Sequence, residues 1–147
     1  MIKGFSAVLV LGALLTGSLA VAPGHAAKNN NAAMPMSVML AAQAFSGVTG
    51  TATLSYAAGV TTVKVTIKHV AAGSLHPAHI HAGGSCSVAG PVIGALNPLQ
   101  ANNAGIATST TPLKGDFTTK AAYINVHLGP GLALTQFTVL ACGVVHM

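Results

Sequence analysis

The stretch VTTVKVTIKHV, residues 60–70, alternates between apolar and polar side chains. In an extended chain Val63, Val65 and Ile67 face one side, and the intervening threonines and lysines face the other. This is the pattern of a β-strand with one buried face. Residues 50–56 alternate in the same way, and three small residues make a turn between the two segments. The two segments therefore predict an antiparallel hairpin.

From residue 37 onward the chain is built of short segments rich in Val, Thr, Ile and Ala, separated by Gly, Pro and Asn. Seven or eight such segments with frequent turns predict one all-β domain over residues 37–147, an antiparallel Greek-key barrel or sandwich. Residues 34–45 fit either a first strand or a short helix. Later strands are expected at residues 78–82, 92–96, 106–111, 121–128 and 137–145.

The N-terminal segment has the features of an export signal. A positive start precedes an almost wholly apolar run from residue 4 to 21, and Gly24-His25-Ala26 supplies the small residues that signal peptidase reads. We expect a signal peptide over residues 1–26 and a flexible linker over 27–36. The protein is then secreted or periplasmic and has no membrane segment after cleavage. The alternative is a transmembrane anchor, because a run of about 18 residues is at the lower limit for spanning.

The charged residues exclude several classes of function. The chain has no arginine and one acidic residue, Asp116. Glycoside hydrolysis by paired carboxylates and calcium binding by an EF-hand both need more acidic groups than this. After signal cleavage, five lysines minus one aspartate give a net charge of +4. The lysines are scattered and no aromatic cluster accompanies them, so we expect no nucleic-acid partner.

Histidine is the functional side chain that the sequence holds in excess, with seven in all. His79 and His81 flank Ile80 in a predicted strand. Both imidazoles therefore project from one face, about 6.5 Å apart along the chain, while Ile80 points into the core. Two nitrogens at that separation can reach one metal ion. The alternative for this motif alone is a pair of surface histidines that bind nothing.

A third histidine has the matching phase in a later strand. There Ile124 and Val126 face the core, which places Asn125 and His127 on the outer side. If the two strands are neighbours, the three histidines converge on the outer surface of the barrel. Imidazole suits copper and zinc, so the pattern predicts a three-histidine metal site.

Cys86 and Cys142 are the two cysteines of the chain. An even pair in an exported protein is expected to form a disulfide. Such a bridge would tie the loop after the His-x-His strand to the last strand and would hold the outer wall of the site. The alternative is that the two thiolates are metal ligands.

Several of these residues occur in motifs of a known family. The stretch LHPAHIH, residues 75–81, is followed by GSC at 84–86, and the last strand reads LACGVV at 140–145. Together with INVH at 124–127, these motifs resemble the Cu/Zn superoxide dismutases. The similarity extends over residues 50–145.

The resemblance implies a superoxide dismutase-like β-barrel with copper as its cofactor. The metal ligands that it implies are His79, His81 and His127. It also implies that His76 is a supporting structural histidine and that Cys86–Cys142 is the disulfide.

The chain departs from that family at the second metal and at the approach of the substrate. After AGP at residues 89–91 the family has the histidine that bridges copper and zinc, whereas Val92 follows here. The family's guiding arginine, three residues before the second cysteine, is Val139 in this chain. We therefore expect no separate zinc site and slow or absent dismutation of superoxide, although zinc could take the place of copper at the three histidines.

The same region also resembles the chordin-type (CHRD) domains of bacterial exported proteins. These carry a stretch similar to HIHAG, residues 79–83, and a strand similar to YINVH, residues 123–127. Three functions follow from the two resemblances: an exported copper-binding module, a mononuclear copper superoxide dismutase, and a non-enzymatic structural or adhesive module with incidental histidines. The missing arginine and bridging histidine favour the first.

Overall fold

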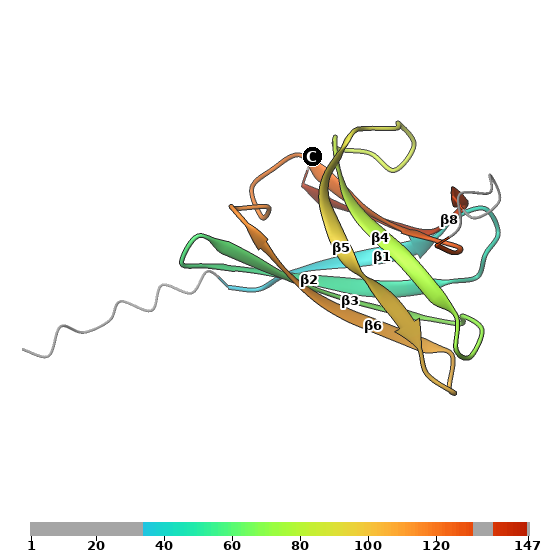
Figure 1. Ribbon diagram of the computed structural model, residues 1–147. Helices are drawn as coiled ribbons and strands as arrows, with labels where there is room; N and C mark the ends of the chain where they lie inside the picture. The colour runs from blue at the N-terminus through green and yellow to red at the C-terminus, as the bar shows by residue number, and fades with distance from the viewer. Residues whose placement is uncertain (1–33, 131–136, 147) are drawn as a thin grey trace, which may run out of the picture.

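The computed structural model describes residues 34–130 and 137–146. This part of the chain forms eight antiparallel strands in one closed barrel (Figure 1). No helix within it is long and apolar enough to cross a membrane. The strands are β1 (Met36–Ala42), β2 (Thr49–Ala57), β3 (Val60–Lys68), β4 (Leu75–Ala82), β5 (Val92–Ala101), β6 (Ile106–Lys114), β7 (Ala122–His127) and β8 (Val139–His146).

The predicted Greek-key barrel is confirmed. The strand order around the barrel is β1-β2-β3-β6-β5-β4-β7-β8, and Figure 1 shows β1, β2, β3 and β6 running side by side. Strands β4, β5 and β6 follow one another along the chain, and β7 returns to lie beside β4, which is a Greek key. The strands that carry the histidines, β4 and β7, are therefore neighbours although β5 and β6 separate them in the sequence.

The alternation in β3 builds one wall of the core. Val63, Val65 and Ile67 are 0% exposed inside the barrel, whereas Lys64 and Lys68 face solvent. The predicted hairpin is confirmed, since β2 and β3 pair without interruption along their whole length. Each fully buried Val or Ile contributes about 1.5–3 kcal/mol to stability, which makes this alternation the main determinant of the fold.

Three strands are markedly longer than predicted, and one of them, β4, begins at Leu75 instead of residue 78. β5 and β6 continue to Ala101 and Lys114, whereas the prediction ended them at residues 96 and 111. Both therefore extend past a proline, Pro98 or Pro112, which lacks the N–H that a sheet ladder uses. The ladder between β5 and β6 is short and joins only Gln100 and Ala101 to their partners. Both prolines lie outside it, so their missing N–H groups break no bond of that ladder.

The N-terminal predictions have different outcomes. The segment 34–45 contains a strand, β1, and the helical alternative is wrong because this segment pairs with β2 on one side and β8 on the other. The predicted signal peptide lies outside the described residues. Of the predicted linker, only its end is described, and its last residue, Met36, begins β1.

Candidate metal centre

The cross-strand register of β4 and β7 positions the histidines. Ile80 pairs with Ile124, and both side chains are 0% exposed inside the barrel. Because side chains alternate along a strand, the adjacent pair of His79 and Asn125 faces outward. His127, two residues beyond Asn125, projects from the same outer face. Core packing thus determines which side the imidazoles occupy.

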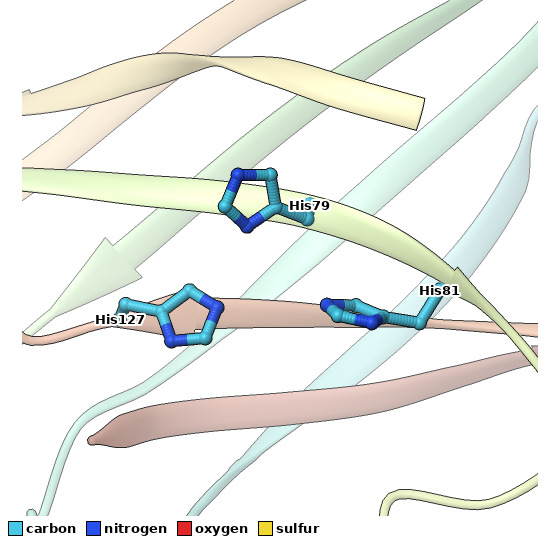
Figure 2. Close-up of side chains that lie close together, drawn as sticks. All are labelled: His79, His81 and His127. Atoms are coloured by element: carbon cyan, nitrogen blue, oxygen red, sulfur yellow. The ribbon is translucent and has the colours of Figure 1, made fainter. Parts of the chain in front are cut away.

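The three histidines named from the sequence lie together. One ring nitrogen from each of His79, His81 and His127 lies within 4.8 Å of the others, and Figure 2 shows these nitrogens turned toward the space between the rings. The ring centroid of His79 is 6.0 Å from that of His81 and 5.4 Å from that of His127. Bonds of about 2.0 Å to a shared ion place two nitrogens at most about 4 Å apart, so small ring rotations bring the set into ligating geometry.

Hydrogen bonds to the backbone orient two of the rings. Nδ1 of His81 donates to the carbonyl oxygen of Gly90 at 2.9 Å, and Nδ1 of His127 donates to that of Phe137 at 2.9 Å. In a neutral imidazole this leaves Nε2 with its lone pair free. Nε2 of His81 is buried and makes no hydrogen bond within the part of the chain that the structure describes. A buried lone pair beside two other imidazoles fits a metal ligand.

The electrostatics of the cluster favour the neutral form of His79. Burial lowers the pKa of His79 below its usual value of 6.5, and the charges that His127 and His81 would carry lower it further. A metal ion binds the neutral form of imidazole. The cluster therefore presents His79 in the form that can ligate at neutral pH.

His76, at the start of β4, is hydrogen-bonded to the backbone of the candidate ligand His127. It is 3% exposed, and its Nδ1 donates to the backbone carbonyl oxygen of His127 at 3.0 Å. Its Nε2 lies 2.7 Å from Oγ of Ser74. The ring of His76 therefore contacts the backbone of a candidate ligand and is not a member of the cluster; the supporting role that the resemblance implied stays a prediction.

The loop between β4 and β5 encloses the other end of the site. The ring of His81 stacks on that of Tyr123, with centroids 5.0 Å apart and planes 9° from parallel. The Tyr123 hydroxyl accepts a hydrogen bond from the backbone N–H of Gly90 at 2.8 Å. A side chain at position 90 would place its Cβ 1.9 Å from the carbonyl oxygen of Ala82. Only glycine lets the loop approach closely enough to hold His81.

A disulfide attaches this loop to the barrel. Cys86 in the loop is bonded to Cys142 in β8, and there are no free cysteines within the described residues. The predicted bridge is confirmed, and the alternative of thiolate metal ligands is wrong. Cys142 pairs in register with Asn125, so the bridge lies over the outer face of β7 next to the histidines.

One expectation about exposure is wrong. His127 and Asn125 project outward as predicted, but each is 8% exposed and therefore buried. The disulfide-bonded loop covers part of the outer face of β7, and the ring of Phe137 contacts that of His127 edge-on, at 6.5 Å between centroids. Alternation along a strand reports which side a residue faces and contains no information about segments that later cover that side.

The sequence interpretation did not identify Tyr123 and Gly90 as parts of the site. A signal for Tyr123 was present, because the alternation that turns Asn125 outward also turns Tyr123 outward. Gly90 is the middle residue of the AGP motif at 89–91. Its role depends on the close approach of the loop to Ala82, which no local pattern reveals.

The fold and the cluster together define a class of protein: a closed Greek-key β-barrel with a three-histidine cluster on the outer face of two neighbouring strands, compatible with copper binding. Among solved structures, the chain is similar to Cu/Zn superoxide dismutase from Brucella abortus, with a TM-score of 0.57 and 21% sequence identity. The alignment covers 76% of this chain and 99% of that chain. At this identity the likeness establishes the superoxide dismutase-like fold alone. No protein-family model matches the chain, and no curated protein matches it either.

Proposed function

We propose that this protein is an exported copper-binding protein whose metal ligands are His79, His81 and His127. The observation that supports the proposal most strongly is the buried Nε2 of His81, which has no hydrogen-bond partner among the described residues and lies beside two other imidazoles. An imidazole nitrogen buried without a partner is costly, and a metal ion would remove that cost.

Three imidazoles without a thiolate or carboxylate form a donor set that suits copper or zinc. Calcium and magnesium prefer oxygen ligands, and the single acidic residue of the chain, Asp116, hydrogen-bonds within its own loop to Thr118. When bound, copper would supply a redox-active centre, and zinc would supply a Lewis acid. Hydrogen bonds to the backbone hold the ring planes of His81 and His127, and burial lowers the pKa of His79 so that its ring is neutral.

Superoxide dismutation is the second candidate. The likeness in fold to a copper enzyme and the net charge of +4 predicted after signal cleavage, which attracts an anion, favour it. Val139 takes the position at which the resemblance implies an arginine, and its side chain cannot attract superoxide. We therefore expect slow or absent dismutation. A structural module of the chordin type is the third candidate, and it requires no metal.

Metal analysis of the protein from an exporting host tests the proposal. We expect about one copper, or one zinc, per chain, and dissociation constants well below micromolar in competition with a chelator. A protein that carries no metal and binds neither ion from a dilute solution would support the structural module. A superoxide dismutation rate near the diffusional limit, about 10⁸–10⁹ M⁻¹s⁻¹, that is lost in His127→Ala would establish the enzyme instead.

A further inference from the structure

Asn125 contains a second buried polar atom without a partner at the same site. Its Oδ1 is buried and makes no hydrogen bond within the described part of the chain. A buried carbonyl-type oxygen destabilises the folded state unless something replaces the water that it lost. A leucine would fill the same space without that cost. Packing therefore does not explain why position 125 is an asparagine, and we expect a functional reason.

The register locates this amide within the cluster. Asn125 pairs with His79 on one side and with Cys142 on the other, and the Cβ atoms of such cross-strand pairs are about 4.5–5.5 Å apart. Along β7 the residues on the same outer face are Tyr123 and His127. Asn125 is therefore surrounded by two of the candidate ligands, the disulfide and an aromatic ring.

None of these neighbours offers a hydrogen to Oδ1. The Nδ1–H groups of His81 and His127 already donate to backbone carbonyl oxygens, and the disulfide sulfur of Cys142 carries no hydrogen. Figure 2 shows one ring nitrogen of His79 turned toward the other two rings and the second turned away from β7, the strand that carries Asn125. The hydroxyl of Tyr123 lies at Gly90 in the loop.

We propose that Oδ1 of Asn125 is a fourth protein donor to the metal ion held by His79, His81 and His127. This inference rests on the proposed metal-binding function. A cation accepts the lone pair that no hydrogen satisfies, and the neutral amide adds no charge to the site. Oxygen is a harder ligand than imidazole nitrogen. A site with three nitrogens and one oxygen therefore favours Cu²⁺ and Zn²⁺ over Cu⁺.

Two substitutions at this position separate metal ligation from packing. Asn125→Leu keeps the size of the side chain and removes the oxygen, and Asn125→Asp keeps an oxygen donor. We expect Leu to weaken Zn²⁺ and Cu²⁺ binding at least about 10-fold, the smaller effect reported for groups that support a metal site. We expect Asp to bind at least as tightly as the wild type. The metal-free Leu variant should unfold at the same temperature as the wild type or a higher one, because it no longer buries an unsatisfied oxygen.

Ser109→Ala is the matched control. Oγ of Ser109 is likewise buried without a partner among the described residues, but it belongs to β6, which does not carry the histidines. Its removal should leave metal affinity unchanged. Relative to the wild type, the Cu²⁺ electron paramagnetic resonance spectrum and visible absorption should change in both Asn125 variants and should not change in Ser109→Ala.

The outcomes distinguish the two proposals. If the wild type binds a metal and Asn125→Leu binds it within about twofold, with an unaltered Cu²⁺ spectrum, Asn125 is no ligand and the three-histidine site stands without it. If the wild type binds neither Zn²⁺ nor Cu²⁺, the proposed function fails and this inference fails with it. If Asn125→Leu does not fold, the spectrum of Asn125→Asp decides. A carboxylate that replaces an amide ligand must alter the spectrum, whereas a substitution outside the coordination sphere would leave it unchanged.

Discussion

Nδ1 of His76 donates a hydrogen bond to the backbone carbonyl oxygen of His127, 3.0 Å away. The bond crosses from the start of β4 to the end of β7, where the regular register of the two strands has ended at Ala78 and Val126. It therefore ties the last residue of β7 to β4 beyond the end of the β4–β7 ladder, whereas on its other side His127 is still paired with Val139 of β8. The position of one candidate ligand depends on the side chain of a residue that is not a ligand.

The substitution His76→Leu should reveal this dependence. It leaves the buried carbonyl of His127 without its donor, which costs about 1–3 kcal/mol of unfolding free energy. Urea denaturation of the metal-free protein measures the loss, and we expect weaker copper binding as well. The control is His69→Asn at an exposed histidine with a positive φ of 67°, which Asn tolerates. Equal stabilities of the two variants would refute the supporting role of His76.

Replacing a candidate ligand should affect affinity more than stability. We expect His79→Gln and His127→Gln each to weaken copper binding by more than about 10- to 100-fold. That range is the loss caused by removing a group that only supports a ligand, and removing a ligand itself should cost more. Competition with a chromophoric chelator measures this. His69→Asn serves again as control, because His69 lies on the loop after β3 and is not one of the three clustered histidines. Unchanged affinity in both Gln variants would place the metal elsewhere.

The titration of His79 should report the cluster electrostatics. Its pKa is lowered by burial first and by His127 and His81 next, so the ring stays neutral below pH 6.5 in the folded protein. The unfolded chain takes up this proton first as the pH falls, and the stability of the metal-free protein therefore decreases below pH 6.5. NMR of the ring protons should give a higher pKa for His79 in His127→Gln, in which one repulsive charge is absent. A pKa of His79 that does not move would rule out His127 as a cause and leave burial and His81.

Gly90→Ala should loosen the loop that holds His81. The new Cβ would lie 1.9 Å from the carbonyl oxygen of Ala82, so the backbone must move and the hydrogen bonds to Tyr123 and His81 must lengthen. We expect lower stability and weaker metal binding together. The matched control is Gly59→Asn at the exposed turn between β2 and β3, where a Cβ meets nothing within 4 Å and φ is +81°. A site in Gly90→Ala that binds copper normally would show that the loop does not position His81.

Reduction of Cys86–Cys142 should destabilise the protein. The bridge spans a sequence separation of 56, and the chain-entropy model gives a contribution of about 4 kcal/mol as an upper figure. Denaturation with and without reductant measures it, and thiol titration of the oxidised protein should find no free thiol. Two titratable thiols before reduction would contradict the bridge.

The sequence predicted most of this architecture because the alternation of apolar and polar side chains is local information. Alternation in residues 60–70 and 50–56 gave the hairpin, and the same alternation placed Ile80, Ile124 and Val126 in the core. The pairing of β4 with β7, the burial of His127 and the extension of β5 beyond Pro98 depend on which segments become neighbours. These features depend on tertiary contacts, which local patterns do not contain. The family resemblance supplied two such contacts, the grouping of the three histidines and the pairing of the two cysteines.

The unpartnered oxygen of Asn125 illustrates the remainder. Its outward direction followed from periodicity, but its lack of a hydrogen donor depends on four neighbours from three strands. Only coordinates show that the Nδ1–H groups of two histidines are already used. An asparagine in a strand gives no local sign that it is more than a surface residue.

The pairing of β4 with β7 also determines when the metal site forms during folding. His81 and His127 are brought together only when the Greek-key crossover has formed, a contact of high sequence separation that is made slowly. An unfolded chain would therefore present to a metal ion at most the isolated His79–His81 pair. The full set of donors would form only after folding. A metal that binds the native state alone shifts the folding equilibrium by mass action. Copper binding by this protein would then report completed folding, and the copper supply would raise the fraction of chains that are native.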